Sequence, residues 1–292
     1  MAGTFANIQK EVGQDHSLRA PYLKEIEKNR GGRAIISFFI SFQSQTPLSQ
    51  VDADMIEEIL VNTDTSRGVT LILDAPGGDG LAAERIIQVC KAHSDGDFET
   101  IVPSRAKSAA TMVCLGSDRI IMSPTSELGP IDPQIPFKIG EQWQWVAAHH
   151  VIKTYDKLMG DAIGLTQGHI EPYLQQLSQF NATQIEMLRA STKLSESIAV
   201  SSLQKGMMNE KGEDEIKDNI KLFTDPEATL SHGRALNHDM LKDCGLNIEL
   251  IDLNEELWKN VWNLYMRSKF VVDRDDFGSK LVETLENSYR AG

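Results

Sequence analysis

Apolar runs of strand length alternate with helical patterns in the first half of the chain, and this alternation restricts the fold more than any other feature. The order is "VTLILDAP", "GLAAERIIQVCKAH", "FETIVPS", "AATMVCLGS" and "DRIIMSP", with only a few residues between neighbouring segments. Strands and helices that alternate over such short connections predict parallel strands joined by crossover helices. The sequence therefore predicts an α/β core that extends from about residue 31 to about residue 136.

Three further elements are predicted ahead of "VTLILDAP". Residues 20–31 have the apolar spacing of a short helix that ends at a glycine. Residues 33–42 are β-branched and aromatic, as in a buried strand, and residues 51–62 form an amphipathic helix.

After residue 136 the pattern becomes helical. Three helices are predicted, in "EQWQWVAAHHVIKTYDKLMGDAIG", "IEPYLQQLSQF" and "ATQIEMLRASTKLSESIAVSSLQKGMM". The segment "LSHGRALNHDMLKDCG" reads as a helix leading into a strand at 247–252, so we expect His232 and His238 on a helix surface. The helix "EELWKNVWNLYMRSKFV" has an apolar stripe typical of a core or an oligomer contact, and the tail after it is expected to be frayed.

Composition excludes some functions. Of 292 residues, 41% are apolar and 24% charged, which predicts a globular protein with a sizeable core. The net charge of −13 argues against nucleic acid as the main partner and, more weakly, against anionic membranes. No signal peptide is recognisable and no stretch reaches ~18 uninterrupted apolar residues, so we expect a cytoplasmic protein without membrane insertion. The widely spaced Cys90, Cys114 and Cys244 are interpreted as buried free thiols.

The turn "DAPGGDG" joins a predicted buried strand to a helix. Its adjacent glycines permit positive φ angles and leave backbone N–H groups directed into the gap, which suits a phosphate or an oxyanion. The turn matches neither the GxGxxG nor the GxxxxGK[ST] motif. An ordinary strand-to-helix turn without a ligand explains it equally well.

A second turn, "AKSAAT", follows the next strand and places Ser108 at the start of a helix of small residues. A serine in this position is usually an N-cap. The neighbouring glycine turn offers an oxyanion site, however, and the proline-rich "SPTSELGPIDP" would form a rigid pocket wall. The two turns together favour a serine nucleophile.

The segments "LDAPGGDGLAAERI", "KSAAT" and "LGSDRIIMSPTSELGPIDPQ" resemble the signal peptide peptidase A and Clp-type serine proteases of the crotonase-like superfamily. Within that group the chain is most similar to the serine dehydrogenase proteinase family, over residues 33–134. The resemblance implies an α/β, crotonase-like spiral of β-β-α units with an added helical C-terminal region. The expected parts are an N-terminal helical arm (1–32), the core with the serine (33–140), a helical cap or insertion (141–215), the closing helix and strand (216–255) and a C-terminal helix expected as an oligomer contact (256–292).

The resemblance also implies roles for individual residues. Ser108 would be the nucleophile, and the amides of Gly78 and Ala109 would form the oxyanion hole. Clp-type enzymes carry a histidine near the position of Ile131, where this chain has none, so a Ser-His-Asp triad of that type is not expected.

The peptidase A branch uses a lysine as the base instead. Lys153 is the first choice here, with Lys193 and His149 as alternatives, whereas Lys107 is expected to point away from the site. No cofactor is expected. A metal site in particular is not expected, because the adjacent histidines His149 and His150 diverge on a helix.

The predicted function is hydrolysis of peptide bonds by a Ser-Lys serine endopeptidase acting through an acyl-enzyme. The expected partners are a peptide or protein substrate and further copies of the chain in a homo-oligomer. Two other functions remain open: a noncatalytic peptide-binding or scaffold protein with the same fold, and crotonase-type chemistry on an acyl thioester.

Overall fold

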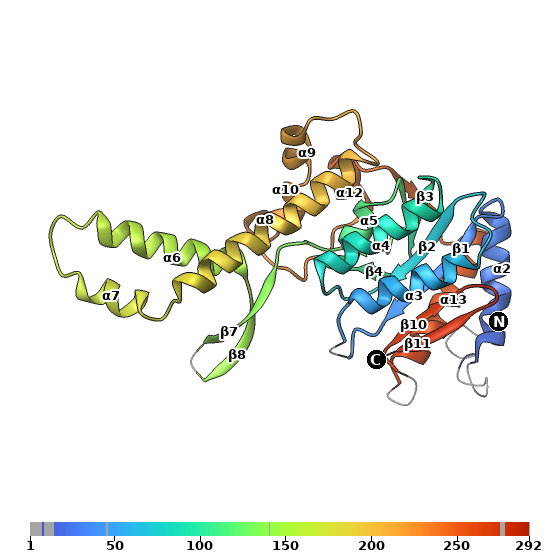
Figure 1. Cartoon of the computed structure of the whole chain (residues 1–292), viewed down its shortest axis with the longest axis horizontal. Coiled ribbons are helices and arrows are strands. Elements are labelled where there is room, and N and C mark those ends of the chain that lie inside the picture. The colour runs from blue at the N-terminus through green and yellow to red at the C-terminus, as the bar shows by residue number, and fades with distance from the viewer. Residues whose placement is uncertain (1–7, 9–14, 45, 140, 275–277, 292) are drawn as a thin grey trace.

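A seven-stranded sheet forms the centre of the computed structural model, with helices on both of its faces (Figure 1). The structure describes residues 8, 15–44, 46–139, 141–274 and 278–291. The strand order is β11 (Ser288–Ala291), β10 (Lys280–Glu283), β1 (Ala34–Ile40), β2 (Val69–Asp74), β3 (Phe98–Val102), β5 (Arg119–Met122) and β9 (Ile248–Leu250).

The strands from β1 to β9 in this order are parallel, and β10 and β11 are antiparallel to their neighbours. The α/β prediction with parallel strands and crossover helices is therefore confirmed. Because parallel strands end at the same edge, the turns after β2 and β3 meet at the carboxyl edge of the sheet.

Helices bury the apolar side chains of both sheet faces. One face is covered by α3 (Gln50–Val61), α4 (Gly80–His93), α5 (Ala109–Leu115) and the second half of α8 (Ala182–Gln204), and the other by α2 (Ala20–Asn29) and α13 (Glu256–Val272). Strand β1 serves both faces because successive side chains alternate. Its Ile36 and Phe38 pack with the first helix layer, and Ile35 and Phe39 with the second.

Short elements complete the core. Strands β4 (Arg105–Ala106) and β6 (Glu127–Leu128) form a small parallel sheet beside the main one. The remaining short helices are η1 (His16–Leu18), α9 (Glu213–Asn219), α10 (Lys221–Thr224), α11 (Pro226–Thr229) and α12 (His238–Asp243). The predicted helix over "LSHGRALNHDMLKDCG" is thus limited to α12, because the Asn237 side chain caps the helix there and accepts a hydrogen bond from the Met240 N–H (3.1 Å).

An arm extends from the core between β6 and α9 (Figure 1). It consists of β7 (Gln134–Ile139), β8 (Gln142–Ala147), α6 (Ala148–Ile163), α7 (Glu171–Leu177) and the first half of α8. The helix predicted from residue 141 is wrong over its first part, because β8 pairs with β7 in an antiparallel hairpin. The alternation of Trp143 and Trp145 with glutamines has the period of a strand and was the signal for it.

The C-terminal part belongs to the core. The apolar stripe of α13, with Val261, Leu264 and Tyr265, is buried against α2 and the sheet, as the core interpretation predicts. The tail expected to be frayed instead forms β10 and β11, because Leu281 and Val282 are buried when β10 pairs with β1.

The predicted free thiols are confirmed. Cys90, Cys114 and Cys244 are buried and unpaired, and burial raises the pKa of the Cys90 and Cys114 thiols to about 12. None of the helices in the described ranges combines the length and the apolar character needed to cross a bilayer.

Candidate active site

The two predicted turns touch each other at the carboxyl edge of the sheet. Ala75 and Ala106 form a parallel bridge, in which the Lys107 N–H donates to the Ala75 carbonyl (3.0 Å). Gly77 follows with φ +104°, and a Cβ atom there would lie 2.7 Å from the Cβ of Ser108. A side chain at Gly77 would collide with the serine, so this close approach requires glycine.

Gly78 is held by the loop before α3. The Leu48 N–H donates to the Gly77 carbonyl (2.8 Å), and the Asp79 N–H donates to the Leu48 carbonyl (2.9 Å). A Cβ on Gly78 would lie 2.4 Å from the Leu48 nitrogen. Within the described residues, the N–H groups of Gly78 and Ala109 have no hydrogen-bond acceptor.

Ser108 occupies a strained backbone conformation. Its φ and ψ are 52° and −122°, and its side chain makes no capping hydrogen bond although it immediately precedes α5. Ser108 is thus the N-cap residue of α5 by position, but its side chain does not cap the helix. A non-glycine residue with such angles costs of order 1–3 kcal/mol and occurs most often at functional sites. The hydroxyl makes no hydrogen bond to the helix amides that a capping serine would satisfy.

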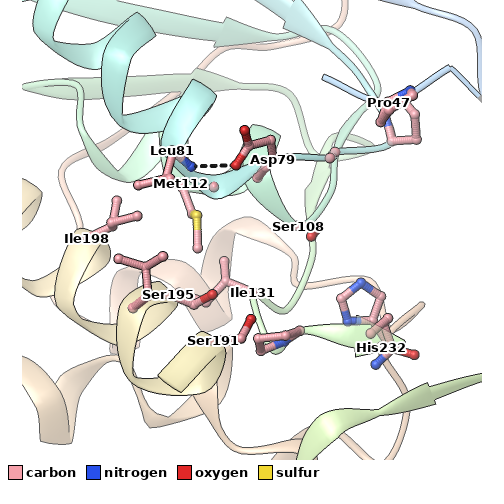
Figure 2. A pocket seen from close by; sticks show the side chains of 18 of the residues that line it. Pro47, Asp79, Leu81, Ser108, Met112, Ile131, Ser191, Ser195, Ile198 and His232 are labelled. Carbon is pink, nitrogen blue, oxygen red and sulfur yellow. Dashed lines mark hydrogen bonds between the residues drawn. The ribbon is translucent and has the colours of Figure 1, made fainter. Parts of the chain in front are cut away.

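The turns open into a cavity of about 870 Å³, called here the serine cavity (Figure 2). The proline-rich segment forms part of its wall, as predicted, through Ile131 and Pro133, and Gln134 directly after it lines the cavity too. The arm provides another part of the wall, from Trp145 on β8 and from α8. The further lining residues are Ser44, Thr46, Pro47, Pro76–Leu81, Ser108, Ala109, Met112, Ser191, Leu194, Ser195, Ile198 and His232.

The residues proposed from the sequence as bases lie elsewhere. Lys153 on α6 is 59% exposed, and its ammonium donates to the carboxylate of Glu227, whose pKa is lowered mainly by this hydrogen bond. His149 lines a smaller neighbouring cavity of about 270 Å³, with its Nε2 3.8 Å from the same carboxylate. Lys193 is exposed on α8. None of these three is among the residues that line the serine cavity.

A histidine that the sequence analysis placed on a helix surface lines the serine cavity instead. His232 lies in the loop between α11 and α12, and its Nδ1 is 2.8 Å from Oδ1 of the buried Asp132. The other carboxylate oxygen of Asp132 accepts a hydrogen bond from Gln134 Nε2 (2.9 Å). Ser231 and Gly233, on either side of the histidine, and the capping Asn237 are the sequence signals that indicated a loop.

Several contacts hold the histidine loop against the Ser108 turn. Leu128 and Leu236 form an antiparallel bridge with two backbone hydrogen bonds of 3.0 Å. The Lys107 ammonium donates to the carbonyls of Leu128 (3.1 Å) and Arg234 (3.3 Å) and pairs with Glu127 (2.7 Å). Lys107 was expected to point away from the site; its side chain is largely buried and lies among these acceptors.

Asp74 lies directly behind the two turns, at the end of β2. Its carboxylate accepts a hydrogen bond from the Arg105 N–H (2.8 Å), and burial raises its pKa to about 7. Among the described residues, no three histidine, cysteine, aspartate or glutamate side chains are placed to hold a metal ion. The polar groups that line the cavity include Ser108, the free N–H groups of Gly78 and Ala109, and the His232 imidazole bonded to a buried carboxylate.

This chain is similar to known proteins over part of its length. Two uncharacterized proteins of Methanocaldococcus jannaschii match it: MJ1495 is 31% identical over 120 residues and MJ0137 is 37% identical over 84 residues. The matches cover 39% and 29% of this chain and 41% and 29% of the relatives. The chain thus spans less than half the length of each of these relatives, and their names assign them no activity.

A family model covers more of the chain than either relative. The model of the ClpP-like SDH-type serine proteinases matches residues 9–162, which is more than half of the 292 residues. The match includes both glycines of the first turn, Ser108 and Asp132, and it ends within α6. The chain belongs to the family of ClpP-like SDH-type serine proteinases.

Proposed function

We propose that this protein is a serine peptidase that hydrolyses peptide bonds through an acyl-enzyme, with Ser108 as the nucleophile. The observation that carries the proposal is the backbone of Ser108, whose positive φ leaves the hydroxyl free of a capping bond at the serine cavity. Its hydroxyl is accessible to a substrate and needs only a proton acceptor to become reactive. Membership in a family of serine proteinases supports the same chemistry.

The amides of Gly78 and Ala109 are proposed as the oxyanion hole. When a nucleophile attacks a carbonyl carbon, negative charge develops on the carbonyl oxygen, and fixed N–H donors stabilise it. Both residues line the serine cavity, and both N–H groups lack a described acceptor. The two backbone hydrogen bonds between Leu48 and the glycine turn hold the Gly78 donor in place before substrate binds.

A peptide segment is the proposed substrate. The cavity of about 870 Å³ exceeds what one side chain fills, and its lining combines apolar groups such as Met112 and Ile198 with backbone. Thioester chemistry of the crotonase type needs the oxyanion hole but no serine beside it, so the position of Ser108 favours the peptidase.

A Ser-Lys dyad with Lys153 is the form of this chemistry that the sequence resemblance implies. Lysine acts as a base only when neutral, and a carboxylate partner favours the charged ammonium. Lys153 pairs with Glu227 and faces solvent, so a dyad would require its side chain to leave this partner and enter the serine cavity. The described conformation thus gives the lysine dyad little support.

Two further predictions accompany the peptidase. The succession of β3, β4 and α5 and then β5 and β6 supports the proposed crotonase-like spiral of β-β-α units. The homo-oligomer is also retained as a proposal, and sedimentation of the purified chain would test it. The apolar stripe of α13 packs against α2 and the sheet within the chain, so it gives little support to a contact through this helix.

A fluorophosphonate probe tests the nucleophile, because it reacts covalently only with activated serines. We expect the wild-type chain to be labelled and Ser108→Ala to remain unlabelled. Ser197→Ala is the matched control, since Ser197 is exposed on α8 and lies outside the cavity lining. Labelling that persists in Ser108→Ala would identify another serine as the nucleophile, whereas a wild-type protein that neither labels nor hydrolyses peptides would favour a noncatalytic peptide-binding protein.

A further inference from the structure

We propose that His232 is the proton acceptor for Ser108 and that Asp132 orients its ring. This inference rests on the proposed peptidase function and replaces the lysine of the dyad with an imidazole. The three residues would form a Ser-Asp-His arrangement in that chain order, with the acid one position after Ile131, in the stretch where Clp-type enzymes carry their histidine.

The hydrogen bond between His232 and Asp132 determines which ring nitrogen is available. An ionised carboxylate can only accept hydrogen bonds, so Nδ1 carries the proton that it shares with Asp132 Oδ1 over 2.8 Å. In a neutral imidazole the other nitrogen, Nε2, then keeps its lone pair. His232 therefore presents a proton acceptor at the end of the ring opposite to Asp132.

Asp132 has the surroundings expected of an orienting carboxylate. Its side chain is only 2% exposed, and Gln134 Nε2 donates to its second oxygen over 2.9 Å. A buried carboxylate needs such partners, because burial of an unpaired charge is strongly unfavourable. Both oxygens are thus held, and the one that faces His232 fixes the plane of the imidazole.

His232 reaches the same space as the proposed nucleophile. Its side chain is 26% exposed, and it lines the serine cavity together with Ser108 and Ala109. Figure 2 shows the Ser108 hydroxyl and the His232 imidazole at the same side of this cavity, with Ser195 and Ile198 of α8 across from them. Among the described residues that line the cavity, Asp79 and His232 have ionisable acid or base side chains. Asp79 caps α4, because its Oδ1 accepts a hydrogen bond from the Leu81 N–H (2.9 Å), so His232 is the candidate base.

The chain leaves α11 through Leu230 just before it reaches His232. Leu230, two residues earlier, has φ 63°, and only Asp95 and Ser108 share a positive φ among the described non-glycine residues. Leu230 is the C-cap residue of α11, where a left-handed conformation is common, and its N–H donates to the Pro226 carbonyl (2.8 Å). Beyond His232, the Lys107 ammonium and the Leu128–Leu236 bridge hold the loop against the Ser108 turn.

Ser108, His232 and the oxyanion hole, together with one water molecule, are sufficient for the proposed hydrolysis. Ser108 Oγ bonds to the substrate carbonyl carbon while its proton passes to His232 Nε2, and the carbonyl π electrons move onto the oxygen held by the oxyanion hole. As the carbon–nitrogen bond breaks, the imidazolium gives its proton to the leaving amine, which leaves an acyl-enzyme. Water then repeats the sequence: His232 takes its proton and returns one to Ser108 as the acyl–oxygen bond breaks.

Rates of fluorophosphonate labelling and of peptide hydrolysis by the full chain test the base. We expect His232→Ala to lower both by about 10²–10⁴-fold, the range for loss of a general acid–base group. Free imidazole added to His232→Ala should restore part of the rate, and it should restore nothing in Ser108→Ala. His149→Ala and Lys153→Ala are the matched controls, because they remove the rival bases without touching the serine cavity, and both should keep the wild-type rate.

Asp132→Asn tests the positioning role. We expect kcat to fall by more than 10-fold while KM and the thermal unfolding midpoint stay near the wild-type values, because the asparagine fills the same space but does not fix the ring tautomer. In the His232→Ala background the same substitution should cause little further loss, since the two residues act as a unit. A loss that is confined to the unfolding midpoint or to KM would show that Asp132 is merely structural.

The outcomes separate this inference from the function on which it rests. Labelling that requires Ser108 but is unchanged in His232→Ala would overturn the inference and leave the peptidase intact. Loss of labelling in Lys153→Ala, with retention in His232→Ala, would restore the lysine dyad. A wild-type chain without labelling or hydrolysis would overturn the peptidase and this assignment together.

Discussion

The core and the arm bury their side chains to very different degrees. All residues of β1, β2 and β3 are buried between two helix layers. In the arm, α7 has no buried residue, and the apolar cluster is limited to Ala148, Val151, Ile185 and Leu188 with a few half-buried neighbours. The arm even exposes the indoles of Trp143 and Trp145 to 69% and 72%. The residues proposed for catalysis thus belong to the well-buried core, whereas one wall of their cavity belongs to the sparsely buried arm.

This difference matters because hydrophobic burial is the main source of stability. The core can tolerate strained residues such as Ser108 since its packing offsets their cost. The arm buries few apolar side chains, so its local free energy of unfolding should be small, and we expect it to open locally while the core stays folded. The predictions below test this contrast, from the largest expected effect to the smallest.

A buried ion pair in the core should give the largest effect. Lys280 of β10 donates to both oxygens of Asp52 (2.8 and 2.7 Å), and neither side chain is more than 6% exposed. Lys280→Met leaves the Asp52 carboxylate buried without its cation, and we expect the free energy of unfolding to fall by about 3–5 kcal/mol. Urea denaturation measures the loss. Lys211→Met is the control, because its partner Glu215 is exposed and keeps contact with water. Equal urea midpoints for the two variants would show that the buried pair stabilises the core no more than an exposed pair does.

The pH dependence of core stability should contain a contribution from Asp74. Burial raises its pKa to about 7, so between pH ~4 and 7 the folded chain binds a proton that the unfolded chain has released. Stability from this group is present below pH ~4 and is lost as the pH rises to about 7, by on the order of 4 kcal/mol. Asp74→Asn keeps an acceptor for the Arg105 N–H and removes the dependence. Urea midpoints of both proteins from pH 4 to 8 should therefore diverge with rising pH, and parallel curves would refute the effect.

One substitution made in both regions compares them directly. Ile59→Ala in α3 and Ile185→Ala in α8 remove the same atoms from side chains that are both almost fully buried. We expect Ile59→Ala to lower global stability by about 2–5 kcal/mol, and Ile185→Ala to change the urea midpoint little while proteolytic cleavage within the arm accelerates at least ~10-fold. Limited proteolysis followed by mass spectrometry locates the cuts. Equal global destabilisation by both variants would mean that the arm and the core unfold together.

The smallest effect is expected for the exposed pair that joins the arm to the core. Lys153 of α6 and Glu227 of α11 are both at least half exposed, and solvent screens such pairs strongly. Lys153→Ala should leave the thermal unfolding midpoint unchanged within error. A clear drop in this midpoint would show that the pair fixes the arm to the core.

The sequence analysis predicted the core well because periodicity reports burial. The segment "VTLILDAP" and the helix pattern after it correspond to β2 and α4, and the helix of small residues after Ser108 is α5. The same argument failed for β8, where the apolar residues Trp143 and Trp145 are exposed and the pattern of the following helix dominated. It failed also for β10, whose short strand gains its stability from pairing with distant β1.

The candidate site was predictable only in its local part. Gly77, Gly78 and Ser108 belong to two turns whose chemistry can be read within a few residues. The pairing of Asp132 with His232 joins positions 100 residues apart, across the whole arm and α9 to α11. No local pattern encodes this distance; it follows from the Leu128–Leu236 bridge, which exists only once the fold has formed.

Helix α8 belongs to both regions, and this continuity has a mechanical consequence. It has 23 residues and contains no glycine or proline, so at 1.5 Å per residue it is a stiff rod of about 35 Å. Ala199 and Leu203 are buried in the core at one end of the helix, and Ile185 and Leu188 pack in the arm at the other. Between them, the serine cavity is lined by Ser191, Leu194, Ser195 and Ile198. Helix α8 is therefore held at its C-terminal end by the core, and its N-terminal end moves with the arm. We therefore expect a displacement of the far end of the arm to tilt α8 and move this wall of the cavity, while the opposite wall, with Ser108 and the histidine loop, stays in place.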